Sequence, residues 1–468
     1  MTKGYQMNNS VLSKFCKLSL AVATTFAISA PLAHAEEEVL PEYTFMDAVK
    51  TGKNMTSFRL RYEHVEQDGN QPAPNATKPL QDADALTLRS LIGWQTAPYK
   101  NFSFALQFIN VAKLNDDFND STFGHVTTPA TNEPGKGAYA KVIDPDETNI
   151  NQAYIDWTGI KNTRVRLGRQ QTNLDNVRFI GDIGFRQVMQ VFDGASIMSK
   201  YIPDTDIFVA HFESVNQINT RHRTDGALEI INAKYYITPT ESVTGYAYLS
   251  SFDDLGFGNG WFGAGTLNNN GKPNATANQS NKVFGARLDG IHPFNPNLRA
   301  VYTAEYAKQS DYSGGDSRID AHYYKIGGGV GIDFLTIRLD QELLSSNNGL
   351  YAFQTPFGTN HLFQGWVDKF LATPRHGIRD TFATATYRWD DLLFFADYHV
   401  YHSDEDFTKS TGGTGDKYGT EWNVAVTYNY SKNIMGKVEY GDFSEDDQYS
   451  PGRIRDTSKF WLTAMYTF

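Results

Sequence analysis

Apolar and polar residues alternate one by one along most of this chain, from residue 57 to its end. In SFRLRYEH, Phe58, Leu60 and Tyr62 alternate with charged residues, and EWNVAVTYNY follows the same pattern. A period of two residues indicates a β-strand, because successive side chains point to opposite faces. We count about 18 such segments of about 8 to 12 residues, the length that a tilted strand needs to cross a membrane.

The connections between these segments fall into two length classes that alternate along the chain. Short turns are predicted at residues 95–101, 158–163, 238–241, 292–297, 390–391 and 431–433. Long polar stretches lie near residues 66–82, 112–148, 170–189, 213–226, 252–280, 310–320, 346–378, 404–418 and 443–456. Outer-membrane barrels have short turns in the periplasm and long loops outside the cell, whereas a soluble sandwich has no reason to sort its connections. We therefore predict an all-β fold, a transmembrane antiparallel β-barrel of about 18 strands in the outer membrane of a Gram-negative bacterium.

The last strand continues to the final residue of the chain. Its apolar positions are Phe460, Leu462, Tyr466 and Phe468, in a region where most domains end in polar residues. An open sheet edge in lipid would leave backbone groups unsatisfied, so we expect this strand to pair with the first strand and close the barrel. The ending also resembles the C-terminal signature of bacterial outer-membrane barrels, which implies recognition by the barrel-insertion machinery.

The N-terminus reads as an export signal. Two lysines precede the apolar run LSLAVATTFAISA, and Ala33-His34-Ala35 forms a small-x-small cleavage site. We expect removal of residues 1–35, a short periplasmic segment at 36–56 and the barrel at 57–468. Cys16, the only cysteine, falls in the signal, so the mature chain has no thiol, disulfide or cysteine metal site. A net charge of −11 makes nucleic acid a poor partner.

Charged residues occupy the face that would line the barrel interior. In the early strands this face is mostly basic, with Arg59, Arg61, Arg89, Arg164 and Arg166, and Arg169 follows at the start of the third long connection. Later strands carry acids beside further cations. Arginines opposite acids would create a charge preference, as rings of charged side chains do in pores. The alternative is that they pair across strands and fill space. We name these six arginines as candidate pore-lining residues.

The stretch at 170–189 is the least ordinary of the long connections. RQQTNLDNVRFIGDIGFRQVMQ carries several large apolar residues together with Asp175, Arg178, Asp182 and Arg186. Apolar residues in an external loop need a surface to bury against. Folding into the barrel would satisfy them and form a constriction that presents these four charged residues to a solute. The alternative is an external cap that packs on neighbouring loops.

Three stretches resemble proteins that carry the alginate-export domain. They are LGRQQTNLDNVRFIGDIGFRQ followed by VFDG, DAVKTGK followed by FRLRYEHVEQDG, and FGTNHLFQGWVDKFLATP. The resemblance implies an outer-membrane barrel of about 18 strands. It also implies an arginine-lined constriction near Arg59, Arg61, Arg89, Arg166, Arg178 and Arg186, through which an acidic polysaccharide would pass. The many acids of the later strands depart from that pattern and favour a smaller solute.

The pattern as a whole favours a passive channel for small hydrophilic solutes, anions among them, surrounded by outer-membrane lipid and lipopolysaccharide. Export of an acidic polysaccharide such as alginate is one alternative, and a non-conducting structural or adhesive barrel is another. An outer-membrane enzyme is the third, but the sequence contains no GxSxG or HExxH motif. The pair His399 and Asp397 is its nearest approach to a catalytic site. We expect no cofactor and no metal.

Overall fold

The computed structural model describes residues 43–71, 77–120, 136–255, 277–409, 412–446 and 455–468. The predicted signal peptide at 1–35 lies outside these residues. Eighteen long strands form a single antiparallel sheet, so the all-β prediction and the predicted strand number are both confirmed. The long strands are β2 (Ser57–Gln67), β3 (Ala83–Gln95), β4 (Phe102–Lys113), β5 (Glu147–Ile160), β6 (Thr163–Gln170), β7 (Val191–Ser199), β8 (Thr205–Asn216), β10 (Leu228–Thr238), β11 (Glu241–Ser250), β12 (Asn281–Asn295), β13 (Leu298–Asp311), β14 (Asp320–Ile332), β15 (Leu335–Leu344), β16 (Ile378–Trp389), β17 (Leu392–Thr408), β18 (Thr414–Tyr428), β19 (Ile434–Glu445) and β20 (Thr457–Thr467).

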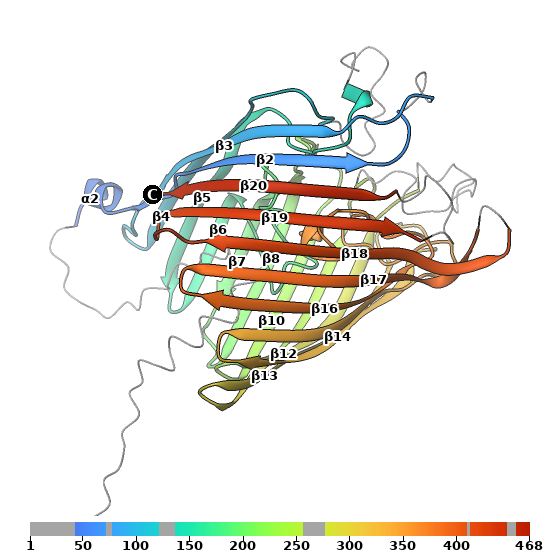
Figure 1. Cartoon of the computed structure of the whole chain (residues 1–468). Coiled ribbons are helices and arrows are strands. Elements are labelled where there is room, and N and C mark those ends of the chain that lie inside the picture. The colour runs from blue at the N-terminus through green and yellow to red at the C-terminus, as the bar shows by residue number, and fades with distance from the viewer. Residues whose placement is uncertain (1–42, 72–76, 121–135, 256–276, 410–411, 447–454) are drawn as a thin grey trace, which may run out of the picture.

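The remaining described elements are short. They are helix α2 (Phe45–Lys50), strands β1 (Lys53–Asn54) and β9 (His222–Arg223), and single 3₁₀ turns at Lys136–Ala138 and Asn360–Leu362. None of the described helices is long and apolar enough to cross a membrane. The described architecture is therefore a wall of strands with its connections (Figure 1).

The sheet closes on itself through its first and last long strands. β2 pairs with β20 in antiparallel register from Ser57 opposite Thr467 to Gln67 opposite Thr457. Aromatic contacts support this seam on the outside, with ring centroids 6.2 Å apart for Phe58 and Phe468. Closure pairs the last strand along its whole length, which explains why the chain stays apolar to its end.

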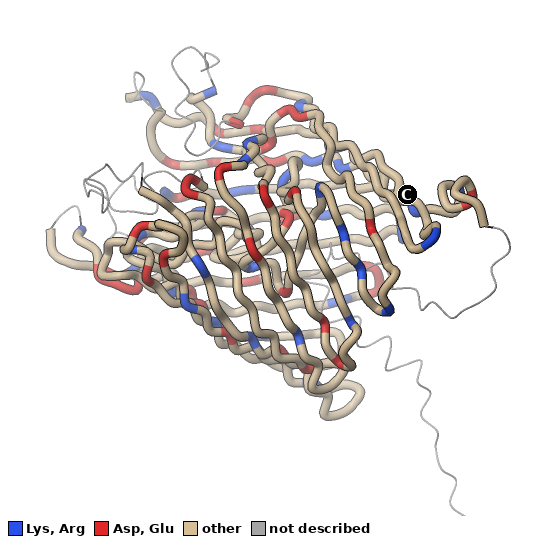
Figure 2. Tube along the Cα trace, turned by 180° about the vertical axis from the view of Figure 1, so that it is seen from behind, with Lys and Arg blue, Asp and Glu red and all other residues tan. Residues whose placement is uncertain are grey.

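Side chains alternate between the two faces of the wall. On β2 the outward Leu60 is 41% exposed, whereas its inward neighbours Arg59 and Arg61 are 4% and 2% exposed. On β13 the outward Tyr306 is 56% exposed and the inward Glu305 is 6% exposed. Figure 2 shows basic and acidic positions interspersed along the strands rather than gathered on separate elements. Apolar side chains thus cover the outside and polar side chains face the interior.

The connections follow the predicted sorting by length, with one difference. The six predicted short turns join consecutive strands at one end, and short turns also lie between Ser199 and Thr205 and between Ile332 and Leu335. The stretch at 404–418, predicted as a loop, is largely strand, because β17 extends to Thr408 and β18 begins at Thr414. This hairpin continues beyond the predicted ends of its strands because Phe407 is buried and stacks on Tyr418.

Two adjacent substitutions on β18 test the assignment of the two faces. Val426 faces outward and is 37% exposed, and the next residue, Thr427, faces inward. We expect Val426→Arg to lower the free energy of unfolding in lipid by about 2–4 kcal/mol if it lies near the bilayer midplane, and by less toward the interface. Thr427→Arg should cost less, because a polar lumen accommodates the charge. Urea titration in vesicles measures both, and equal losses would contradict the assignment.

Candidate functional site

Two long connections turn into the barrel and fill part of its interior. They are the segment 171–190, called here the first inner loop, and the segment 345–377, called the second inner loop. Ile180 of the first and Tyr351 of the second are 1% and 0% exposed. Backbone hydrogen bonds join the two loops, from Gly181 N to Phe357 O at 2.9 Å and from Thr359 N to Val177 O at 2.9 Å. The loops therefore form one unit inside the wall.

An aromatic cluster holds this unit against one side of the barrel. The ring of Phe179 lies 5.5 Å from Tyr246, 5.2 Å from Tyr323 and 5.9 Å from Phe353, measured between centroids. Tyr246 and Tyr323 belong to the inner faces of β11 and β14, and Phe353 belongs to the second inner loop. Burial of large aromatic side chains supplies the main apolar contribution to loop attachment. Phe179 was one of the apolar residues that made this loop unusual in the sequence.

Arg59 attaches the opposite end of the first inner loop to the wall. Its guanidinium donates to Gln187 Oε1 at 2.9 Å, to Gly184 O at 2.7 Å and to Phe185 O at 2.9 Å, and it also donates to the carbonyl of Arg186. A turn without regular secondary structure leaves carbonyls unpaired, and an arginine offers five donors to satisfy them. Arg59 is therefore occupied by the loop backbone.

The neighbouring arginines make the same kind of contact. Arg61 donates to Phe185 O, pairs with Asp144 Oδ2 at 2.8 Å and lies 4.5 Å from the centre of the Phe185 ring. Arg89 reaches Arg186 O at 3.5 Å. Arg61 and Arg89 are 2% and 1% exposed. The structure thus brings the predicted β2 and β3 arginines together, beneath the first inner loop rather than at an open water surface.

Arg186 links the two inner loops to the wall through carboxylates. It pairs with Glu63 Oε2 of β2 at 3.0 Å and with Asp368 Oδ2 of the second inner loop at 2.9 Å. Asp368 also accepts from Lys459 Nζ at 2.9 Å and contacts His361 Nδ1 at 2.8 Å. Burial opposes ionisation of Asp368, but the charge of Lys459 and the contact with His361 outweigh it and hold the pKa of Asp368 well below its usual range. The carboxylate therefore remains charged at neutral pH.

Arg178 attaches the first inner loop to the far wall. Its Nε lies 2.9 Å from Glu342 Oε1 of β15, and Nη2 donates to Gln364 Oε1 at 3.0 Å. The guanidinium also lies 4.6 Å from the centre of the Phe363 ring. With 1% exposure, Arg178 is as covered as the β2 arginines. Arg178 and Arg186 thus secure one loop to two different parts of the barrel.

The two predicted loop acids also make internal contacts. Asp175 pairs with Lys234 Nζ at 2.9 Å and accepts from Asn232 Nδ2 at 2.6 Å, both on β10. Asp182 accepts from Gly184 N at 2.9 Å and from Gln171 Nε2 at 3.3 Å. Burial raises the pKa of Asp182. Both acids stabilise the conformation and attachment of the first inner loop.

The three β6 arginines are placed in different surroundings. Arg166 makes a two-point pair with Asp156 at 2.7 and 2.8 Å. Arg164 lies on the same inward face, with Met198 Sδ 4.0 Å away. Arg169 instead shares the face of Leu167, which is 62% exposed, and pairs with Asp193 at 2.7 and 2.9 Å. Arg169 does not join the interior group.

Sequence reasoning missed several partners of the predicted residues. Glu63 has the same strand parity as Arg59 and Arg61, so the alternation could have identified it as an inward residue. Asp144, Gln187 and Asp368 lie in connections without periodicity. No local pattern shows that Asp144 and Gln187 meet β2, or that Asp368 meets Arg186 and Lys459. Gln187 donates to Thr87 Oγ1 at 2.8 Å, and its backbone N–H donates to Asp144 Oδ1 at 3.0 Å.

Lys325 differs from most of the interior cations described above, and like Arg164 it has no described hydrogen bond or ion pair with a carboxylate or carbonyl. Its Nζ lies 5.6 Å from the centre of the Phe363 ring and 5.1 Å from that of Phe382. Its cross-strand neighbours are Glu305 and Glu342. Glu305 is paired with Arg287 at 2.9 Å, and Glu342 is paired with Arg178. Among the described residues no acid pairs with Lys325, which leaves its ammonium group available between two aromatic rings.

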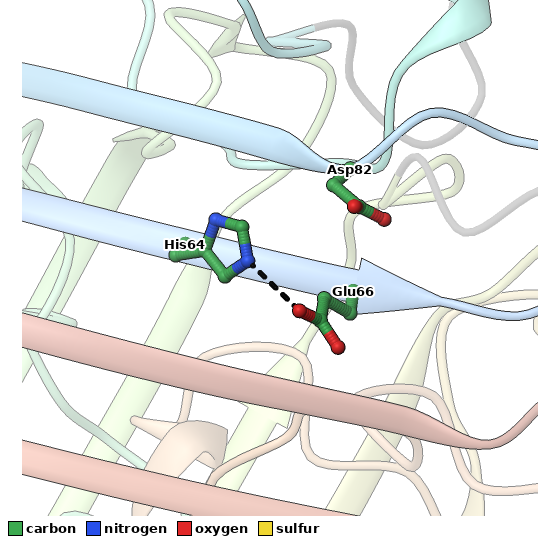
Figure 3. A group of neighbouring side chains, drawn as sticks. All are labelled: His64, Glu66 and Asp82. Atoms are coloured by element: carbon green, nitrogen blue, oxygen red, sulfur yellow. Dashed lines mark hydrogen bonds and ion pairs between the residues drawn. The ribbon is translucent and has the colours of Figure 1, made fainter.

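A further cluster lies outside the lumen, at the loop end of β2 (Figure 3). Ligand atoms of His64, Glu66 and Asp82 lie within 4.8 Å of one another. Both nitrogens of His64 are engaged, Nδ1 with Asp84 Oδ1 at 2.9 Å and Nε2 with Glu66 Oε1 at 3.3 Å. The observed contacts are therefore those of a histidine between two carboxylates on the outer face.

The chain matches one family model and a group of solved barrels. The model, described as alginate export, matches residues 56–344. OpdQ of Pseudomonas aeruginosa has a TM-score of 0.60 and 13% identity, covering 90% of this chain and 99% of its own. OpdK of the same organism, solved with vanillate, has a TM-score of 0.60 and 12% identity, covering 89% and 98%. OccAB2 of Acinetobacter baumannii has a TM-score of 0.62 and 15% identity, covering 90% and 98%. No curated protein sequence matches the chain. At these identities the solved structures establish the barrel fold.

Removing Arg59 tests the attachment of the first inner loop. Arg59→Ala removes the described donor of Gly184 O and one of the two donors that each of Phe185 O and Arg186 O accepts from. A buried carbonyl left without a donor costs about 1–3 kcal/mol. We expect the loop to detach, giving faster proteolysis within residues 171–190 of the protein in vesicles. Arg169→Ala, on the other face of the wall, is the matched control and should leave the proteolysis rate unchanged. Equal rates for both variants would contradict the anchoring role.

Proposed function

The chain belongs to the alginate export family, and we propose that it forms a channel for passive diffusion of small hydrophilic solutes, with a preference for anions. The observation that carries the proposal is a closed outer-membrane barrel with a polar inner face, whose lumen is narrowed by two attached loops. A barrel of 18 strands is too wide for its wall side chains to fill, so it encloses space for water and solute. Lipid and lipopolysaccharide surround its outer face.

The preference for anions is supported by Lys325. Most of the interior cations described here lie against carboxylates or loop carbonyls, so few of their donor groups are left to bind a solute. Lys325 has an unpaired ammonium group between Phe363 and Phe382. A fixed charge in a low-dielectric surrounding acts more strongly on a passing ion than the same charge in bulk water. The similar OpdK barrel, solved with vanillate, supports a small organic anion as the class of solute.

Export of an acidic polysaccharide such as alginate is the second candidate, and the family match favours it. A polymer would need a continuous track of accessible positive charge. Five of the six arginines that the family resemblance assigned to the constriction are at most 5% exposed, namely Arg59, Arg61, Arg89, Arg178 and Arg186. Their engagement by the inner loops supports a small solute over a polymer.

The enzyme alternative has its best candidate at His399. Its Nδ1 lies 2.8 Å from Asp380 Oδ2 and its Nε2 lies 3.2 Å from Asp397 Oδ2. Two carboxylates thus flank the imidazole, and its described hydrogen bonds include no hydroxyl group that could act as a nucleophile. This arrangement supports a structural ion-pair role.

For assembly, the outward Tyr466 and Phe468 at the chain end support recognition by the insertion machinery.

Planar-bilayer recording tests the channel itself. We expect the purified protein to give steady open-state current steps in KCl, because a barrel of 18 strands with a polar inner wall encloses water. Vesicles containing the protein should swell in isosmotic solutions of small sugars and organic acids. Absence of both signals from protein that passes a heat-modifiability assay for the folded barrel would favour the non-conducting structural barrel.

Replacement of Lys325 tests the anion preference separately. Lys325→Gln removes the unpaired charge while keeping much of the side-chain length, so we expect the reversal potential in a KCl gradient to shift toward that of a cation-preferring channel. Lys308→Gln is the matched control, because Lys308 lies on the outward face of β13 and pairs with Asp320. If both variants keep the original reversal potential, Lys325 does not set selectivity.

A further inference from the structure

Helix α2 has a fixed position at the turn end of the barrel (Figure 1). Thr44 caps it, since Asp47 N donates to Thr44 Oγ1 at 3.2 Å and Thr44 N donates to Asp47 Oδ2 at 3.0 Å. The barrel holds its other end, because Trp94 Nε1 donates to Val49 O at 2.8 Å. Reciprocal capping together with a tertiary hydrogen bond keeps even this short helix in place.

The contacts of α2 place it on the outside of the wall. The ring of Phe45 packs edge-on against Phe104 of β4 and Tyr99 of the adjoining turn, at centroid distances of 6.1 and 6.0 Å. Phe104 belongs to the outward apolar row of β4, where Phe102, Leu106 and Phe108 are also exposed. The helix therefore continues the lipid-facing surface at the turn end of the barrel.

Two apolar side chains of α2 remain uncovered by the other described residues. Phe45 is 46% exposed and Met46 is 58% exposed, whereas Ala48 is fully buried against the barrel. Asp47, which is partly exposed, and Lys50, which is exposed, are charged residues of the same helix. This division, with apolar residues beside a lipid-facing row and charged residues beside them, is typical of a helix that lies in a membrane interface.

We propose that α2 is an interfacial anchor, and that Phe45 and Met46 insert into the periplasmic leaflet of the outer membrane. The partner is the phospholipid of that leaflet, because the exposed side chains adjoin the surface that already faces its acyl chains. Asp47 and Lys50 then lie at the headgroups. This anchor sets the depth of the turn end in the bilayer, and it does so independently of the solute that passes through the barrel.

Depth-dependent quenching tests the anchor. Cys16 is the only cysteine, so a Cys16→Ser background allows single labels at Met46→Cys, at Lys50→Cys as the polar control and at Leu106→Cys as the lipid-facing control. Each variant carries an environment-sensitive fluorophore and is reconstituted in phosphatidylethanolamine and phosphatidylglycerol vesicles. The quenchers are lipids with a nitroxide near the headgroup or deep in the acyl chain, and aqueous iodide.

We expect the label at position 46 to be quenched most by the shallow nitroxide, the label at 106 by both nitroxides, and the label at 50 mainly by iodide. Quenching at 46 that matches position 50 would overturn the proposal, and so would protection from all quenchers. Heat-modifiability on gels shows that each variant is folded. Because the readout needs no transport, its failure is distinguishable from failure of the channel hypothesis.

Discussion

Satisfaction of backbone hydrogen bonds in a medium without water is the constraint on which this structure depends. Each unpaired N–H or C=O in hydrocarbon costs several kcal/mol, so a sheet in lipid must close. β2 and β20, some 400 residues apart in the chain, therefore pair along their full length. Closure in turn defines an inner and an outer face of the sheet. A strand presents polar side chains to the lumen and apolar side chains to lipid only if the two kinds alternate along it.

The same constraint acts a second time inside the barrel. The inner loops lack regular secondary structure over most of their length, so their carbonyls need donors from elsewhere. Arg59 provides donors to three consecutive carbonyls of the first inner loop and to a glutamine of the same loop. Asp144 pairs with Arg61, and Glu63 and Asp368 pair with Arg186 in this region. The basic patch thus supplies hydrogen-bond donors to the irregular backbone of the inner loops, in addition to any effect on a solute.

An inward arginine that anchors a loop does not by itself set the selectivity of the channel. A carboxylate cancels most of the net charge of the cation that it pairs with, whereas neutral carbonyls only occupy the donor groups of a cation. A cation in either position has few donors left to bind a solute. Lys325 therefore weighs more in our proposal than the larger number of buried arginines. Membership of the alginate export family and the barrel fold together define a conduit, and the pairing state of each interior charge decides what the conduit prefers.

Local spacing was sufficient to predict the fold. Alternation at Phe58, Leu60 and Tyr62 gave the strand and its faces, and the alternating connection lengths gave the barrel, because both depend on neighbours in the chain. The aromatic ending predicted closure for the same reason. The apolar content of 170–189 indicated that this loop needed a surface to bury against, but not which one.

Contacts between distant segments were beyond the reach of the sequence. That Arg186 meets Glu63 and Asp368, or that Arg169 faces away from Arg166, follows from loop paths and local irregularities that have no period. Pairing also decides the role of each charge, since the sequence shows Arg59 and Lys325 alike as inward cations. Only the tertiary structure occupies the donors of Arg59 and leaves those of Lys325 without an acid partner, because the partners of a side chain are what lies near it in space and not its neighbours along the chain.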